Sequence, residues 1–172
     1  MRPTNQRPGT QQESAGPELI ERMISLDRVT RVVKGGRRFR FRATVVVGDG
    51  HGGVGVGVGK GRDVASAIQK ATLVGRKNLF TLKLTGTTIA HEVEAKFCGA
   101  RVFMKPAPEG TGVIAGGAVR SVLEVAGVRD VFTKALGSTN KINNAQATLV
   151  ALQALKHDEV PGKKVAQKET AK

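Results

Sequence analysis

The sequence contains no tryptophan, no tyrosine and a single cysteine, Cys98, among its 172 residues. One cysteine cannot form a disulfide within the chain, and one thiol with three scattered histidines does not supply the four ligands of a structural zinc site. No apolar run reaches the ~18–20 residues of a membrane span, and the polar start of the chain lacks the apolar core of a secretory signal. We therefore expect a cytoplasmic protein with no membrane partner, no metal and no other cofactor.

Acidic residues are also scarce, since 14 Asp and Glu stand against 28 Lys and Arg and leave a formal net charge of +14. The segment Arg22–Arg42 holds eight basic residues and one acid, Asp27, so it carries half of that net charge. The segment also has a strand-like pattern, which distinguishes it from a bare basic tail. Because cations at this density repel one another unless a ligand neutralises them, the segment predicts a surface that binds a polyanion. A solvated charged face is the alternative interpretation.

Apolar periodicity is confined to the middle of the chain. Residues 1–17 and 157–172 lack it, which predicts a disordered N-terminal tail and a polar, Lys-rich C-terminal tail. The remainder is predicted to form two small domains, residues 18–84 and 91–156, with the boundary near Leu84–His91.

The first domain is predicted to be an α+β unit with its helices on one face of a sheet and the other face free. A Gly-Gly pair marks a hairpin turn at Lys34–Arg37. The expected elements are a short helical turn at 17–21, strands at 23–33, 38–47 and 54–59, and a helix from Asp63 to Leu79.

Arginine and phenylalanine alternate along the second of these strands. Side chains on a strand point to opposite faces in turn, so Arg38, Arg40 and Arg42 should share one face and Phe39 and Phe41 the other. Aromatic residues between cations can stack on nucleic-acid bases. Here they lie opposite the cations, so we expect both Phe side chains to pack in the core and the three Arg side chains to face phosphate.

The glycine-rich stretch that follows resembles nucleotide-binding motifs only in part. Gly50–Gly55 fits G-x-G-x-x-G, but an alternating Val-Gly strand follows it where a dinucleotide site needs a helix. The residues before Lys60 do not match a P-loop either. A strand without side chains on one face instead lets another backbone, of protein or of nucleic acid, approach closely. Lys60 and Arg62 next to a helix N-terminus suit a phosphate group.

The second domain is predicted to alternate strands and helices, which requires a crossover connection. Its expected elements are strands at 91–97, 100–105 and 130–136 and helices at 118–126 and 142–155. His91 and Cys98 could form a catalytic pair, but an isolated cysteine is more often a small buried apolar residue. No pair of acids has a spacing suited to acid–base catalysis. We therefore predict that the protein is not an enzyme and has no small-molecule substrate.

A set of basic residues and two glycines forms the predicted nucleic-acid site. The cations should contact phosphates, and the glycines should let the protein backbone approach the nucleic acid closely. The residues are Arg28, Lys34, Gly35, Gly36, Arg37, Arg38, Arg40, Arg42, Lys60 and Arg62.

Several long motifs resemble one family, the fifth small-subunit ribosomal protein of bacteria. The resemblance extends over about Leu19–Leu155. In the first half the matching segments are Val32–Phe39, Val46–Gly50, Val58–Lys60 and Ala67–Ala71; in the second half they are Arg101–Met104, Glu109–Gly117, Val122–Gly127 and Gly137–Asn140.

This resemblance implies a first domain like the double-stranded-RNA-binding fold, α-β-β-β-α, and a second α/β domain with a left-handed βαβ crossover. It also implies a structural constituent of the 30S subunit that binds 16S ribosomal RNA and contributes to translational accuracy. The implied neighbours are the fourth and eighth small-subunit proteins and mRNA near the channel through which it enters. Lys34–Arg38 matches the basic loop that contacts RNA, and Gly112 and Arg120 fall near the fourth protein.

Two other functions remain open at this point. A free-standing RNA-binding protein or chaperone could carry the same first domain. A small phosphate-binding enzyme could use the Gly110–Gly117 loop, which precedes a helix.

Overall fold

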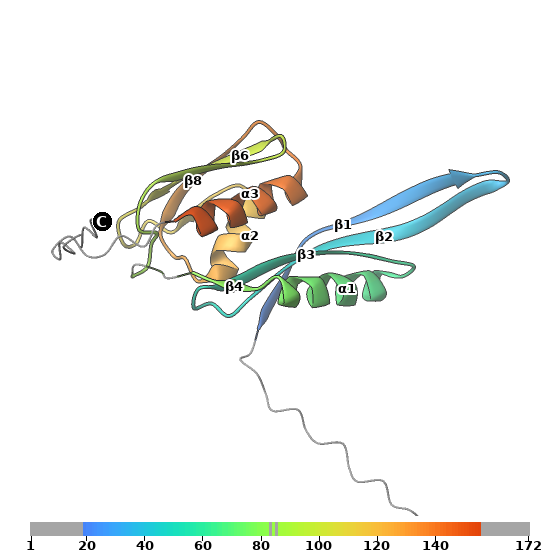
Figure 1. Cartoon of the computed structure of the whole chain (residues 1–172), viewed down its shortest axis with the longest axis horizontal. Helices are drawn as coiled ribbons and strands as arrows, with labels where there is room; N and C mark the ends of the chain where they lie inside the picture. Colours follow the sequence, from blue (N-terminus) through green and yellow to red (C-terminus); the bar gives the residue numbers. More distant parts are fainter. Residues whose placement is uncertain (1–18, 83, 85, 156–172) are drawn as a thin grey trace, which may run out of the picture.

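The computed structural model describes residues 19–82, 84 and 86–155, which form two four-stranded sheets and three α-helices (Figure 1). The fold is therefore of the mixed α+β type. The first sheet has the order β1-β2-β3-β4 and carries α1; its elements are β1 (Ile20–Val33), β2 (Gly36–Gly48), β3 (Gly53–Gly61), α1 (Val64–Lys77) and β4 (Phe80–Thr81). The second sheet has the order β5-β6-β8-β7; its half of the chain comprises β5 (Val93–Phe97), β6 (Ala100–Pro106), β7 (Val113–Ile114), α2 (Gly117–Ala126), β8 (Val131–Leu136) and α3 (Lys141–Ala154).

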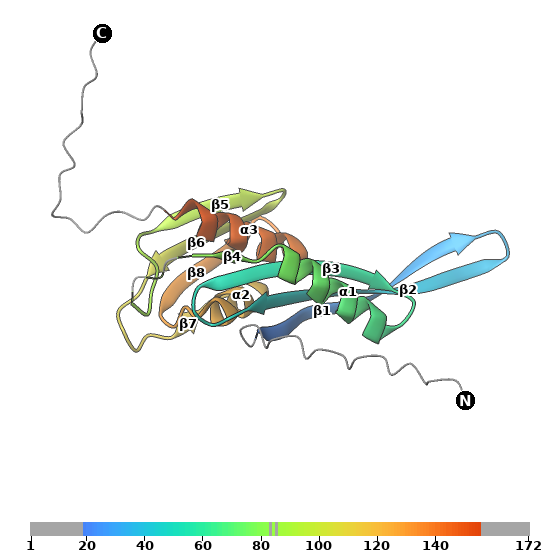
Figure 2. The same cartoon turned by 60° about the horizontal axis from the view of Figure 1, so that its bottom comes forward.

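Strands β1 and β2 form a long antiparallel hairpin whose tip extends away from the rest of the fold (Figures 1 and 2). Strand β3 pairs with β2 only between Phe41 and Gly48, so the part of the hairpin nearer the tip consists of two strands alone. The tip is the turn at Lys34 and Gly35, and Gly35 has φ +87°. This is the left-handed region that glycine enters at little cost, as the predicted Gly-Gly turn requires.

Helix α1 packs directly on the glycine face of β3. A Cβ atom built on Gly57 would overlap the carbonyl oxygen of Ala71, and one on Gly59 would overlap that of Ala67. The other face of β3 carries Val54 and Val56, which are buried. The Val-Gly alternation therefore brings a protein backbone close to the strand, and that backbone belongs to α1.

Helix α2 connects two parallel strands of the second sheet. Val113 of β7 pairs with Val131 of β8, and α2 lies between these strands in the sequence. A βαβ connection is thus present, but it starts from β7, which was not predicted, since the predicted strands 100–105 and 130–136 pair antiparallel as β6 and β8. The inward face of α2 is fully apolar and buried, as its spacing predicts: Val119, Val122, Leu123, Val125 and Ala126.

The largest hydrophobic core is continuous across both halves of the described chain. Val46, Val54 and Val56 of the first sheet share one cluster with Leu123 and Val125 of α2. A smaller cluster, which includes Val45, Val47 and Ala67, lies between the first sheet and α1. The face of the first sheet that was predicted to be free is therefore covered in part by α2, because Val46, Val54 and Val56 present apolar side chains on that face.

The turn between β2 and β3 closes against the C-terminal end of α2. The Gly50 N–H donates to the carbonyl of Val125 (3.1 Å) and the Gly52 N–H to that of Ala126 (2.9 Å). These carbonyls belong to the last turn of α2, where a helix has no internal donors left. Within the turn, Asp49 Oδ1 accepts from the backbone N–H groups of His51 and Gly53; burial raises the pKa of Asp49, but these hydrogen bonds outweigh it and hold the pKa below its ordinary value.

The beginning of the first sheet differs from the sequence prediction. The helical turn predicted at 17–21 is wrong for Ile20 and Glu21, which begin β1 and pair with Gly48 and Val47 of β2. Residues 17 and 18 lie outside the described chain, as do the predicted tails 1–17 and 157–172. The short strands β4 and β7 were not predicted, because two residues are too few to show a period.

Two predictions of burial are also wrong. Phe39 is 46% exposed, because it lies on the part of β2 that neither β3 nor α1 reaches, whereas Phe41 packs against the smaller core as predicted. Cys98 is exposed, because it lies in the tight turn between β5 and β6 with φ +51°.

Candidate nucleic-acid interface

The hairpin places its cations on both faces in a regular pattern. Cross-strand partners in an antiparallel pair point to the same face, and Arg38 pairs with Arg31, Arg40 with Val29 and Arg42 with Asp27. Arg38, Arg40 and Arg42 therefore share one face, as predicted. Arg37 lies on the opposite face with Phe39 and Phe41.

The cations near the tip have no acidic partner among the described residues. In the described part of the chain, no carboxylate lies within the 4.0 Å of an ion pair from Lys34, Arg37, Arg38 or Arg40. All four side chains are exposed. Like charges held this close leave a strong positive potential around the tip, which a polyanion can neutralise.

Arg42 differs from the other predicted phosphate ligands. Its guanidinium donates through Nε (3.3 Å) and Nη2 (3.0 Å) to Oδ2 of Asp27 on the facing strand. The only acid of the basic segment is thus paired with Arg42, the innermost of the four arginines on β2. The unpaired charge is consequently concentrated toward the tip.

Arg28 stacks on Phe39 with its guanidinium carbon 3.7 Å from the ring centroid. A cation held over an aromatic face keeps its charge and loses part of its conformational freedom. The exposed Phe39 therefore has a role the sequence prediction missed, which is to hold Arg28. The register of the hairpin explains this contact, because Thr30 pairs with Phe39 and Arg28 pairs with Phe41. The side chains of Arg28 and Phe39 therefore lie on the same face, and the hairpin register would have been enough to predict their contact.

The glycines at the tip leave the backbone accessible. A Cβ built on Gly35 or Gly36 would have no atom of the described chain within 4 Å. The positive φ of Gly35, given above, explains why glycine is needed there. An approaching ligand would meet bare backbone at the tip of the turn.

Lys60 and Arg62 lie where β3 leads into α1. Lys60 pairs with Arg42 in the sheet register, so it extends the cationic face of the hairpin toward the helix. Asp63 is the N-cap residue of α1, and the Ser66 hydroxyl accepts from the Asp63 N–H (3.3 Å) and donates to the Asp63 carbonyl (3.0 Å). Both cations are exposed, and no described carboxylate pairs with either.

The two residues predicted to contact a partner protein, Gly112 and Arg120, lie in the other half of the chain. Gly112 has φ +79° and donates its N–H to Oδ1 of the buried Asp130 (2.9 Å). This bond, a hydrogen bond from Thr87 and further backbone N–H groups lower the pKa of Asp130 below its ordinary value. Arg120 is exposed and bonds to Glu124 one turn later on α2 (3.0 Å).

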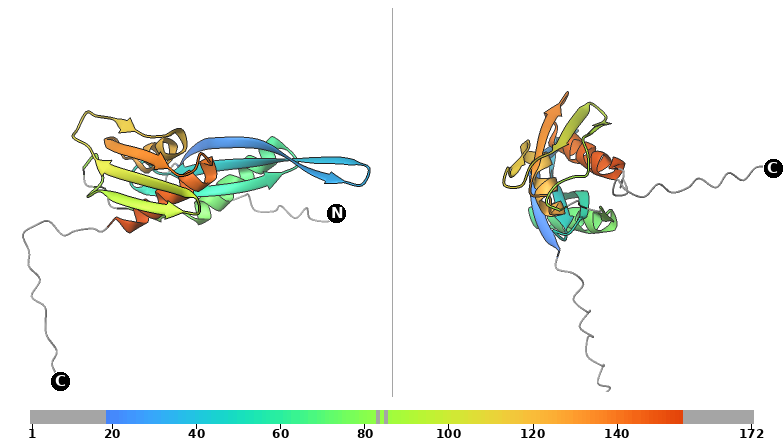
Figure 3. Two further views of the ribbon diagram at one scale, coloured as in Figure 1. Left: turned by 90° about the horizontal axis from the view of Figure 1, so that it is seen from above. Right: turned by 90° about the vertical axis from the view of Figure 1, so that its left-hand side faces the viewer.

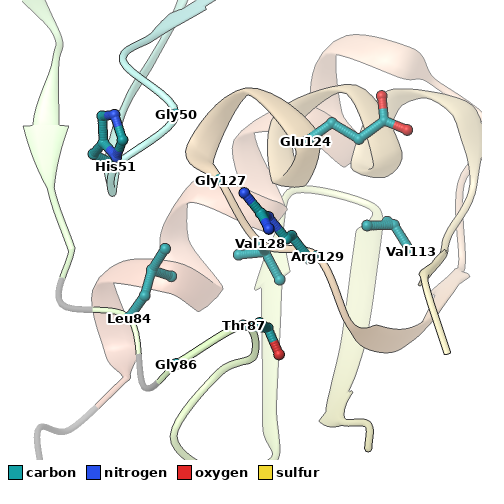
Figure 4. Close-up of a pocket in the computed structure, with 10 residues that line it drawn as sticks. All are labelled: Gly50, His51, Leu84, Gly86, Thr87, Val113, Glu124, Gly127, Val128 and Arg129. Atoms are coloured by element: carbon teal, nitrogen blue, oxygen red, sulfur yellow. The ribbon is translucent and has the colours of Figure 1, made fainter. Parts of the chain in front are cut away.

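A cavity of about 710 Å³ lies beside the β2–β3 turn and the end of α2 (Figure 4). Its lining residues are Gly50, His51, Leu84, Gly86, Thr87, Val113, Glu124, Gly127, Val128 and Arg129. His51, Glu124 and Arg129 supply its ionisable side chains. No group of three metal-ligating side chains occurs in the described residues, so the cavity holds no such cluster.

Cys98 and His91, which were considered as a catalytic pair and disfavoured on the sequence, do not form a hydrogen-bonded dyad in the described structure. Among the described residues no hydrogen bond connects them, and Cys98 lies at an exposed turn.

None of the helices described is long and apolar enough to cross a membrane.

Family models match both halves of the chain. The N-terminal domain of ribosomal protein S5 matches residues 19–83, and its C-terminal domain matches residues 95–168. These matches define the chain as a ribosomal protein.

Curated relatives match over most of the chain. The small ribosomal subunit protein uS5 of Idiomarina loihiensis is 54% identical over 147 residues, which is 86% of this chain and 89% of that protein. The protein of that name from Marinobacter nauticus gives the same values, and that from Pseudoalteromonas translucida is 55% identical over 137 residues, 80% of this chain and 82% of the relative. The chain therefore belongs to the ribosomal protein S5 family, and the resemblance seen in its motifs is confirmed.

Proposed function

We propose that the outer part of the β1–β2 hairpin binds 16S ribosomal RNA. The chain is a structural constituent of the small subunit in the cytoplasmic ribosome and is not an enzyme. The observation that carries the proposal is the group of cations at the tip, Lys34, Arg37, Arg38 and Arg40, which no described carboxylate neutralises. Their ligand must be a polyanion with closely spaced charges, and folded RNA has this property.

The binding mode follows from the geometry of a two-stranded ribbon. A-form RNA presents phosphates and 2′-hydroxyls across its shallow groove, where proteins read shape more than sequence. A hairpin with cations on both faces can contact phosphates on two sides, and its bare glycine tip admits close backbone contact. Arg28, held by Phe39, and Lys60 and Arg62 at the start of α1 extend the contact area, with Arg42 at its inner limit.

We further propose the finer features of the fold that the family resemblance implies. The β1–β2–β3–α1 arrangement supports a first domain, residues 18–84, of the double-stranded-RNA-binding type. The first helix of the implied α-β-β-β-α order does not occur among the described residues, where β1 is the first element. The β7–α2–β8 crossover supports a second α/β domain, residues 91–156. Left-handed connectivity for this crossover is proposed from the family resemblance alone.

Partner proteins are proposed for the second half of the chain. Gly112, fixed by Asp130, and Arg120, fixed by Glu124, are held in place by hydrogen bonds, as residues of a protein interface would be. We assign them to contacts with the fourth small-subunit protein. The same proposal includes contacts with the eighth small-subunit protein and with mRNA near the channel through which it enters. It also includes an effect on translational accuracy.

The salt dependence of binding tests the hairpin assignment. Each phosphate contact removed should reduce the slope of log affinity against log salt by about 0.7–0.9. Arg37→Ala with Arg38→Ala should therefore flatten the slope by about twice that amount and reduce incorporation into 30S particles sedimented through a high-salt gradient. Arg129→Ala, an exposed arginine away from the hairpin, is the matched control. An unchanged slope and unchanged incorporation in the double variant would show that the hairpin is not the RNA site.

A further inference from the structure

The second sheet has one face that none of the three described helices covers. Helix α3 packs on the opposite face, where Ala95, Val102, Met104 and Val131 are buried in the main core. The left-hand view in Figure 3 looks onto the uncovered side, with α3 behind the strands. We call this uncovered side the open face.

The open face combines aromatic rings with cations. Along β6 and β8 the buried side chains alternate with outward ones, so Phe103 and Phe132 point to the open face. Phe132 is 41% exposed and Phe103 is half-buried. Four exposed cations share this face: Lys96, Arg101, Lys105 and Lys134.

The register places each ring beside a lysine. Phe103 pairs directly with Lys134, and Lys105 pairs with Phe132. The two rings are therefore diagonal neighbours on adjacent strands, a relationship that separates positions by about 7–8 Å in antiparallel sheets. This spacing lets two rings take two bases of an extended single strand, while the adjacent ammonium groups reach its phosphates.

The charge of the face selects the kind of partner. Its one acid, Glu94, is paired with Arg101 (3.0 Å), and no described carboxylate pairs with Lys96, Lys105 or Lys134. Lysines are depleted in protein–protein interfaces. Three lysines without a described acidic partner surround the exposed Phe132 and the half-buried Phe103. This combination is better matched to a polyanion with accessible bases than to a protein surface.

We propose that the open face of the second sheet binds single-stranded RNA, with Phe103 and Phe132 stacking on bases and Lys105 and Lys134 contacting phosphates. This site is separate from the basic hairpin and differs from it in kind. The hairpin offers charges to a folded polyanion, whereas the open face requires unpaired bases. The two sites can therefore be tested independently.

The experiment measures binding of a fluorescein-labelled oligouridylate of about a dozen nucleotides to the full chain. The Arg37→Ala, Arg38→Ala background removes charge contacts from the hairpin. In that background Phe132→Leu keeps an apolar side chain and removes the stacking surface, and it should weaken binding about five-fold or more, the lower end of one base–aromatic stack. Phe103→Leu should have the same effect. A coincident thermal unfolding transition verifies that each variant is folded.

An abasic strand of the same length separates stacking from charge. It offers the same phosphates without bases, so neither Phe→Leu change should alter its affinity. Lys134→Gln should flatten the salt slope by about 0.7 for either strand, and Lys70→Gln, an exposed lysine on α1, should leave it unchanged. Binding of duplex RNA by the chain with its hairpin intact should be unaffected by Phe132→Leu.

Oligouridylate binding that is equally tight in the parent, Phe132→Leu and Phe103→Leu proteins would overturn the inference and leave the open face as a surface for a protein. That result would leave the proposed function of the hairpin intact. The hairpin variant is compared with the parent in the same way: if it loses duplex binding but its oligouridylate binding still depends on Phe103 and Phe132, the two sites act independently.

Discussion

The carboxylate of Glu124 on α2 forms an ion pair with the guanidinium of Arg22 on β1. The same carboxylate accepts from Arg120, one turn earlier on the helix. One acid thus connects the strand that leads into the basic hairpin with the residue proposed to face a partner protein. All three side chains are at least one-third exposed, so solvent screens their interaction.

Glu124→Gln should consequently lower the free energy of unfolding by no more than about 1 kcal/mol, the range of exposed ion pairs. The effect should shrink as salt is added, because the interaction is screened. Urea unfolding at low and high ionic strength measures both. Glu94→Gln, which breaks the exposed pair with Arg101, is the control. A loss above about 3 kcal/mol would mean that the pair behaves as a buried one.

Gly57→Ala tests the contact between β3 and α1. The new methyl group would overlap the carbonyl oxygen of Ala71, so strand and helix must move apart, at a cost of about 1–3 kcal/mol or more. Gly117→Ala is the matched control, because its Cβ meets nothing within 4 Å and alanine favours the helix it begins. The midpoint of thermal unfolding should fall for the first variant only. Equal stability of the two would show that α1 does not pack this closely.

Acid should destabilise the protein through Asp130. Hydrogen bonds from Gly112 and Thr87 lower the pKa of this carboxyl in the folded state. A carboxyl whose pKa is lower in the folded state stabilises the fold at any pH above its pKa in the unfolded chain, about 3.9. This stabilisation is lost as the pH falls toward the pKa of the folded state. Asp49 contributes with the same sign.

Asp130→Asn removes the titration while it keeps an oxygen that can accept from Gly112. The variant should be less stable than the parent at neutral pH, and the difference between them should narrow below pH ~4. Urea midpoints measured across this pH range make the comparison. Parallel pH profiles for the two proteins would contradict the assignment.

Phe39→Leu tests whether the aromatic ring positions Arg28. The charge of the hairpin stays the same, so the salt slope of RNA binding should not change. Loss of an exposed cation–π contact should cost about 0.5–1 kcal/mol of binding free energy, or a factor of about two to five in affinity. Phe39→Leu combined with Arg28→Ala should be no weaker than Arg28→Ala alone. A further loss in the double variant would mean that Phe39 acts by itself, for example by stacking on a base.

Much of this fold could be predicted from the sequence, because its signals are local. The Gly-Gly turn, the alternation along β2 and the inward positions of α2 all follow from the spacing of residues within one element. The exposure of Phe39 could not be predicted in this way, since it depends on where β3 stops pairing with β2. The exposure of Cys98 depends likewise on a tight turn, and the partner of the Val-Gly strand depends on tertiary packing.

The sequence was enough to predict which basic residues form the candidate site, but not all of the contacts that these residues make. The positions of Arg38 and Arg40 follow from strand geometry, whereas the Arg42–Asp27 pair requires the register of two strands. The open face of the second sheet was missed because Phe103, Phe132 and the lysines beside them are spread over 30 or more positions of sequence. Only strand pairing brings them together.

The position of α2 has a consequence for how the chain is made. Val54 and Val56 of β3 emerge from the translating ribosome well before Leu123 and Val125, which cover them. At bacterial synthesis rates of about 5–20 residues per second, this interval lasts several seconds. Throughout that time the apolar side chains of β3 are not covered by α2, and the same nascent chain carries a strongly cationic segment. Synthesis from the N-terminus therefore leaves the nascent chain open to premature association until α2 has been synthesised.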